Sequence, residues 1–128
     1  MNNKIEINKY IELHKAGIEK IINYFKRAYP SLSVLKGYGV DLVLSNGNTT
    51  HKINVEIKPG WVVYDFSYKY ITLSKSYLTK VNTVDIFCVV NQPLTRAIIL
   101  STKQLLDGTV SDSCIFVPVI LSNFVDLV

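Results

Sequence analysis

The sequence predicts an α/β fold, in which a central mixed β-sheet is flanked by helices. Two observations support this prediction: an amphipathic helical pattern opens the chain, and short β-branched strands then alternate with short helical segments. A chain of 128 residues, of which 48% are hydrophobic, is long enough to bury one core. We therefore expect a single domain over residues 1–128.

The first element is a helix over about residues 9–28, and it ends before Pro30 because the residue preceding a proline disfavours helical geometry. One apolar stripe runs along it and consists of Ile11, Ile18, Ile21, Ile22 and Phe25. Glu12 and Glu19 lie seven residues apart on one side of the helix, at the margin of this stripe. Either glutamate could point into solvent or lean over the sheet, and the pattern leaves both alternatives open.

Three strands are predicted next, over residues 33–35, 40–45 and 52–58. The last two form a hairpin around a turn at residues 46–50, which are rich in asparagine, glycine and threonine.

Two carboxylates are expected to meet in this hairpin. Side-chain alternation places Glu56 and Lys58 on one face of the second strand, and Val55 and Ile57 on the other face. If the turn holds four residues, Asp41 lies directly across from Glu56. Adjacent carboxylates repel each other unless a cation or a proton separates them. The pair therefore points to a divalent metal, and the neighbouring lysine points to hydrolytic chemistry.

The rest of the chain supplies further strands and two short helical segments. Residues 61–70 are rich in aromatic side chains and could form another strand. The other predicted elements are a helix over residues 74–81 with Ser74 as its N-cap, strands over 84–90, 97–100 and 114–119, and a helical turn over 101–107. The apolar tail over 120–128 packs either on the body of the protein or on a partner subunit.

The charge is unevenly distributed. Residues 1–80 contain twelve Lys or Arg against six Asp or Glu, whereas residues 81–128 contain two against four. This asymmetry favours a polyanion, such as nucleic acid, bound over the first part of the chain, although solvated surface lysines are the alternative. Tyr68, Lys69 and Lys75 are candidate nucleic-acid contacts, since aromatic rings near lysines can stack on bases. A role of the aromatic residues in the core or in a dimer contact is an equal alternative.

Other classes of site are not expected. His14 and His51 stand alone, without the spacing of a zinc site, and no glycine-rich phosphate loop follows a strand. Cys88 and Cys114 are widely separated and suit a reducing compartment. Apolar runs such as residues 115–121 are too short to span a bilayer, and the N-terminus lacks the apolar segment of a signal peptide. We therefore expect a cytoplasmic protein with no membrane association.

The order of elements and motifs resembles the PD-(D/E)XK (restriction-endonuclease-like) nuclease superfamily, and within it the archaeal-type Holliday junction resolvases. The resemblance covers about residues 12–107. Gly39-Val40-Asp41 matches the aspartate motif of that superfamily, and Val55-Glu56-Ile57-Lys58 matches its Glu-x-Lys motif. Ala16-Gly17-Ile18-Glu19 matches the place of a metal-site glutamate, which favours Glu19 over Glu12. Val40 stands where the proline of the superfamily name would precede the aspartate.

The resemblance implies a restriction-endonuclease-like core and a DNA endonuclease that depends on Mg²⁺, with Mn²⁺ as a substitute. Asp41, Glu56 and the backbone carbonyl of Ile57 would hold the ion, and Glu19 would bind a second ion or orient a water. Lys58 would contact the attacking water or the phosphate. A homodimer is expected, because two strands must be cut by single-site subunits. The alternative is a non-catalytic nucleic-acid-binding or assembly protein on the same fold, and the preferred DNA structure stays open.

Overall fold

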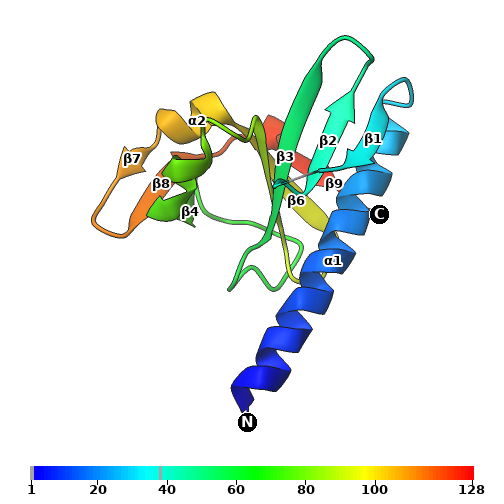
Figure 1. The fold of residues 1–128 in the computed structure, drawn as a ribbon. Coiled ribbons are helices and arrows are strands. Elements are labelled where there is room, and N and C mark those ends of the chain that lie inside the picture. The colour runs from blue at the N-terminus through cyan, green and yellow to red at the C-terminus, as the bar shows by residue number, and fades with distance from the viewer. Residues whose placement is uncertain (1, 38) are drawn as a thin grey trace.

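Two β-sheets and one long helix make up the structure (Figure 1). It is a computed structural model that describes residues 2–37 and 39–128, with side chains from Asn8 onward. The larger sheet has six strands in the order β1 (Ser33–Lys36), β2 (Leu42–Ser45), β3 (Thr50–Ile57), β5 (Ile86–Val90), β6 (Arg96–Ser101) and β9 (Phe124–Asp126). Because β3 and β5 are parallel and the other neighbours are antiparallel, the predicted mixed central sheet is confirmed.

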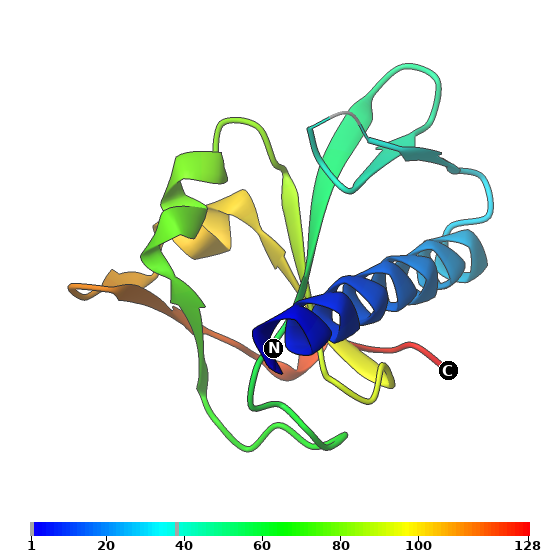
Figure 2. The same ribbon diagram turned by 60° about the horizontal axis from the view of Figure 1, so that its bottom comes forward.

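The second sheet was not predicted. It has the order β4 (Tyr70–Ser74), β8 (Cys114–Pro118) and β7 (Thr109–Val110). The helical elements are α1 (Asn2–Ala28), α2 (Thr102–Leu106) and the 3₁₀ helices η1 (Lys75–Lys80) and η2 (Leu121–Asn123). Figure 2 shows α1 on one side of the larger sheet and the second sheet on the other. One hydrophobic cluster fills each interface, so the larger sheet is covered on both faces.

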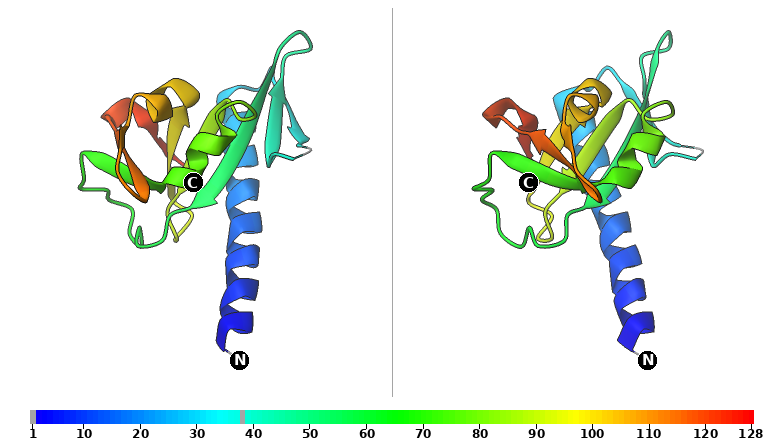
Figure 3. Two further views of the ribbon diagram at one scale, coloured as in Figure 1. Left: turned by 60° about the vertical axis from the view of Figure 1, so that its left-hand side comes forward. Right: turned by 90° about the vertical axis from the view of Figure 1, so that its left-hand side faces the viewer.

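Helix α1 packs its second half on the sheet. Ile21 and Phe25 are buried there, whereas Ile11 is 45% exposed, so its assignment to the apolar stripe is wrong. The helix begins at Asn2 because residues 2–8 contain no proline or glycine that would interrupt it, and its first turns project past the sheets (Figure 3). A Cβ added to Gly17 would lie 2.7 Å from Ile57 Cδ1, so α1 approaches β3 closely at this residue. No helix in the described part of the chain has the length and hydropathy needed to cross a membrane.

The register of the hairpin corrects one prediction. Ser45 pairs with Thr50 and Leu42 with Ile53, so the turn does hold four residues. Continuing this register places Asp41 opposite residue 54, and its expected position directly across from Glu56 is wrong by two residues. The Asn46 side chain closes the turn, because its Oδ1 accepts hydrogen bonds from the backbone N–H groups of Asn48 and Thr49, at 2.9 and 2.8 Å. These bonds fix where the strand pairing begins.

The aromatic segment over residues 61–69 is a loop and not the strand that its alternation suggested. Internal hydrogen bonds replace a strand ladder: Trp61 Nε1 donates to the carbonyl of Asp65 at 3.0 Å, and the amide of Asn91 donates to the carbonyl of Val63 at 3.1 Å. Strand β4 begins only at Tyr70, and it joins the second sheet.

The C-terminal tail chiefly completes the core of its own chain. Strand β9 pairs with β6 at the edge of the larger sheet, and Leu127 is buried. Ile115 and Val117 of β8 are also buried, whereas Ile120 and Leu121 are 65% and 82% exposed. Of the two alternatives for the tail, the structure supports packing on the body of the protein for most of it.

Asn91 offers a direct test of the contacts that hold the aromatic loop over residues 61–69. Its buried side chain donates to Val63 and Thr95 and accepts from the backbone N–H groups of Thr95 and Arg96, at 2.9 and 3.0 Å. We expect Asn91→Ala to lower the free energy of unfolding by about 3 kcal/mol, because several buried polar groups lose their partner. Gln92→Ala is the matched control, since Gln92 is exposed. Equal stability of the two variants in chemical denaturation would contradict this account.

Candidate active site

The candidate site lies where β3 loses its neighbour. The β2–β3 ladder ends at the pair Leu42–Ile53, and the remainder of β3 is paired only with β5 within the described part of the chain. The backbone of Val55 therefore points to an open strand edge, and side chains take the place of the missing strand. Val55 N donates to Asp41 Oδ2 at 2.7 Å, and Val55 O lies 2.8 Å from His14 Nε2.

The carbonyl of Ile57 belongs to the same edge. Alternate residues of a strand direct their backbone groups to the same side, and Ile57 follows Val55 by two. In agreement with this, Lys58 N donates to Val90 O on the opposite side, toward β5. Asp41 Oδ2 and the Ile57 carbonyl thus lie along the same edge of β3, and Glu56 stands between Val55 and Ile57 on that strand.

His14 holds the aspartate side of the site. Its Nε2 contacts Val55 O and also lies 3.8 Å from Asp41 Oδ2, and both side chains are partly buried. Because a carbonyl oxygen can only accept, Nε2 must carry the proton in this arrangement. His14 therefore donates a hydrogen bond to the edge of β3. This contact gives a single histidine a structural role.

Glu56 is held by tyrosines. The hydroxyl of Tyr10, on α1, donates to Glu56 Oε1 at 3.0 Å, and the buried Tyr77 approaches from η1. Burial, followed by the Glu56 carboxylate, raises the pKa of Tyr10 to about 12. Burial is also the largest cause that raises the pKa of Tyr77, and proximity to Glu56 is the second. Both phenols thus remain protonated and able to donate to the carboxylate.

One face of α1 serves both acids. Tyr10 and His14 are four residues apart, so they lie one turn apart on the helix, with parallel rings whose centroids are 6.3 Å apart. Tyr10 contacts Glu56 and His14 contacts Asp41. The helix thereby fixes the two carboxylates relative to each other, although they are not paired across the hairpin.

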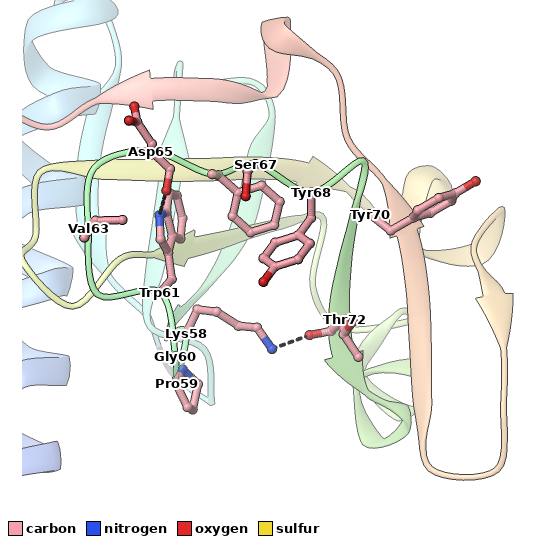
Figure 4. A pocket seen from close by; sticks show the side chains of 11 residues that line it. Lys58, Pro59, Gly60, Trp61, Val63, Asp65, Ser67, Tyr68, Tyr70 and Thr72 are labelled. Carbon is pink, nitrogen blue, oxygen red and sulfur yellow. Dashed lines mark hydrogen bonds between the residues drawn. The ribbon is translucent and has the colours of Figure 1, made fainter.

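Lys58 is hydrogen bonded to β4 and not paired with either of the two acids. Its Nζ donates to the carbonyl of Thr72 on β4 at 2.6 Å, and Figure 4 shows the side chain extended along the floor of a pocket. In the described residues no carboxylate lies within ion-pair distance of Lys58. The pocket, of about 440 Å³, is formed by the loop after β3 and by β4.

Glu19 is not brought to this site. It is exposed on α1, and five residues of helix rotate its side chain by about 140° from that of His14. Glu12 is also exposed, and the same geometry turns it away from His14 by about 160°. From Asn8 onward, leaving out residue 38, no three His, Cys, Asp or Glu side chains are grouped as a metal site would require.

The three predicted nucleic-acid contacts are exposed, and one of them lines the pocket. Tyr68 lines it and is 73% exposed, Lys69 precedes β4, and Lys75 begins η1. The sequence analysis did not identify Tyr10, His14, Tyr77 or Thr72 as parts of the site. The four-residue spacing of Tyr10 and His14 could have indicated that both lie on one face of α1. Tyr77 and Thr72 gave no such indication, because they reach the site only through long-range strand pairing.

Comparison with known proteins establishes the fold. No protein-family model matches the sequence, and no curated protein matches it. The structure is similar to the 1.6 Å resolution structure of Archaeoglobus fulgidus Hjc, a Holliday junction resolvase from an archaeal hyperthermophile. The TM-score is 0.51 and the identity 11%, over 80% of this chain and 84% of that chain. The chain thus shares a distant likeness of fold with that structure, and its own fold is a central mixed sheet flanked by helices.

The raised pKa of Tyr10 makes a pH-dependent contribution to stability. The folded state keeps the Tyr10 proton up to about pH 12, whereas an ordinary tyrosine loses it near 10.0. The contribution is therefore complete below pH 10 and is lost as the pH rises toward 12. We expect the stability difference between wild type and Tyr10→Phe to shrink over this range in urea unfolding. Tyr29→Phe is the control for removing an exposed phenol, and a pH-independent difference for Tyr10→Phe would argue against the contact with Glu56.

Proposed function

We propose that the protein is a metal-dependent DNA endonuclease that hydrolyses phosphodiester bonds. The observation that carries this proposal is the placement of Asp41, Glu56 and the Ile57 carbonyl along the open edge of β3. A fold similar to that of a Holliday junction resolvase adds support. A resolvase-like preference for branched DNA is the finer form of the same proposal.

The donor set fits a hard divalent ion. Mg²⁺ prefers oxygen ligands, needs few of them from the protein and retains several waters. Asp41 and Glu56 supply carboxylate oxygens and Ile57 a carbonyl, whereas sulfur and imidazole donors are not needed. Mg²⁺ bound there would neutralise charge at the scissile phosphate and activate water for attack.

The other residues would orient these groups. His14 holds Asp41 at the strand edge, and Tyr10 keeps Glu56 directed toward α1. Lys58 would exchange the Thr72 carbonyl for the phosphate or the attacking water, which its flexible side chain permits, and would stabilise the charge that develops in the transition state. Glu19 has no part in this arrangement.

DNA is the proposed partner, with the lysine-rich residues 1–80 as its surface. Lys69, Lys75 and Tyr68 would contact it close to the pocket. The homodimer stays a prediction; exposed apolar side chains such as Leu121 and Ile120 are available for such a contact.

A non-catalytic nucleic-acid-binding or assembly protein is the second candidate. It is favoured by one observation, the hydrogen bond that holds Lys58 on Thr72 and away from both carboxylates. Binding without cleavage in the presence of Mg²⁺ or Mn²⁺ would select this alternative.

Removal of the site's charged groups tests the catalytic proposal. We expect Asp41→Asn, Glu56→Gln and Lys58→Met each to lower the cleavage rate by at least about 100-fold, because each loses a contact required at the transition state. The measurement is Mg²⁺-dependent cleavage of junction, flap, single-stranded and duplex DNA, which EDTA should abolish.

The matched control for the carboxylate variants is Glu12→Gln, an exposed acid on α1. DNA binding in Ca²⁺ should survive Glu56→Gln, which separates loss of chemistry from loss of binding. Unchanged cleavage by Glu56→Gln would show that the site is assigned to the wrong residues. Glu19→Gln should behave like the Glu12→Gln control.

Salt dependence tests the proposed DNA path. Each lysine that neutralises a phosphate releases counterions, so the double variant Lys69→Ala/Lys75→Ala should bind DNA more weakly and flatten the logarithmic salt slope by about 2. Lys103→Ala removes an exposed lysine outside residues 1–80 and is the control, which should leave the slope unchanged. If the double variant changes the slope no more than Lys103→Ala does, DNA does not follow this path.

A further inference from the structure

The pocket beside Lys58 has the size of a ligand site and no role in the proposed chemistry. Its volume of about 440 Å³ lies within the range of pockets that take small ligands. It is formed by the loop that follows β3 on one side and by β4 on the other (Figure 4).

Four aromatic rings belong to the lining, and two of them, Trp61 and Phe66, are fixed by packing. Trp61 is 5% exposed and is anchored by its hydrogen bond to the Asp65 carbonyl. Trp61 and Phe66 pack edge to face with centroids 5.2 Å apart, and Phe66 and Tyr68 do so at 5.6 Å. The series ends in Tyr68, whose ring is 73% exposed and hangs from the loop toward the Lys58–Thr72 hydrogen bond (Figure 4).

The charge in the pocket suits an anion attached to the planar group. Lys58 extends into it, whereas the Asp65 carboxylate points outward from the loop (Figure 4). Glu56 precedes Lys58, the residue directly after β3, by two residues, a backbone separation of about 7 Å. A ligand in the pocket is therefore next to the proposed site of phosphate cleavage.

A nucleotide combines the two features that the pocket accommodates, a flat ring and a phosphate. Bases stack on exposed aromatic side chains without regard to sequence. A paired base inside a duplex cannot enter a concave pocket, because it is already stacked and hydrogen bonded, so only an unpaired or extruded base can do so.

We infer that this pocket binds the base of an unpaired nucleotide adjoining the scissile phosphate, with Tyr68 as its stacking platform. The inference rests on the proposed function for its DNA partner, and it narrows the substrate class to DNA that contains unpaired nucleotides. Lys58 thereby has two roles, one at the floor of the pocket and one at the phosphate.

Binding measured without cleavage tests the inference separately from the nuclease proposal. The protein is Glu56→Gln, and the probes are a duplex with a single-stranded thymidine overhang and a fully paired duplex of equal length. A fluorescent adenine analogue within the overhang reports stacking. We expect its fluorescence to be quenched on binding, and Tyr68→Ala to abolish the quenching and weaken overhang binding about tenfold. Affinity for the paired duplex should stay unchanged.

Three variants control this experiment. Tyr68→Phe keeps the ring and should keep both the quenching and the affinity. Ser67→Trp places a large ring at an exposed residue of the lining and should block the pocket. Tyr29→Ala removes another exposed tyrosine, outside the pocket, and should have no effect.

The inference is overturned if Tyr68→Ala weakens both DNA probes equally, if it weakens neither, or if the analogue is not quenched. These results do not depend on cleavage. Quenching that requires Tyr68, in a wild-type protein that never cuts DNA, would reject the nuclease proposal and retain the pocket. Metal-dependent cutting without any effect of Tyr68→Ala would do the reverse.

Discussion

The site depends on the edge of β3 that β2 leaves unpaired. A buried or half-buried backbone N–H or C=O without a partner is costly, so something must satisfy Val55 where the ladder stops. Asp41 and His14 do this, at 2.7 and 2.8 Å. The same side chains that complete the sheet therefore carry the chemistry assigned to the site, and substitutions there will affect stability as well as activity. Conservative variants such as Asp41→Asn are needed for that reason.

Helix α1 sets the spacing of the site. Gly17 lets it lie close to Ile57, and the turn before this contact directs His14 and Tyr10 over the strand edge. Glu56 then lies close to two phenols, Tyr10 from α1 and Tyr77 from η1. The carboxylates are thus positioned by neighbours from three elements, and the hairpin register also places Asp41, whose N–H donates to the carbonyl of Ile53 at 3.1 Å.

Local sequence patterns predicted the elements that local forces determine. The end of α1 before Pro30, the Ser74 cap of η1 and the helical turn over 101–107 all follow from nearby residues, and all three are confirmed. The second sheet could not be predicted this way, because Ile71 pairs with Val117, far along the chain. That pairing brings Thr72 to Lys58 and forms one wall of the pocket. The hydrogen-bond partner of Lys58 could therefore not be predicted from local sequence either. The wrong pairing of Asp41 had another cause. A four-residue turn already requires Leu42 to face Ile53, so the predicted turn length was not compatible with Asp41 opposite Glu56.

The central claim is that the open edge of β3 is a metal site. Crystals of the wild-type protein grown with Mn²⁺ test it most directly, because the anomalous scattering of Mn²⁺ locates the ion without reference to activity. We predict an ion bound by Asp41, Glu56 and the carbonyl of Ile57, and its loss in crystals of Glu56→Gln. An ion bound elsewhere on the protein, or an edge that stays free of Mn²⁺ at saturating concentration, would contradict the account.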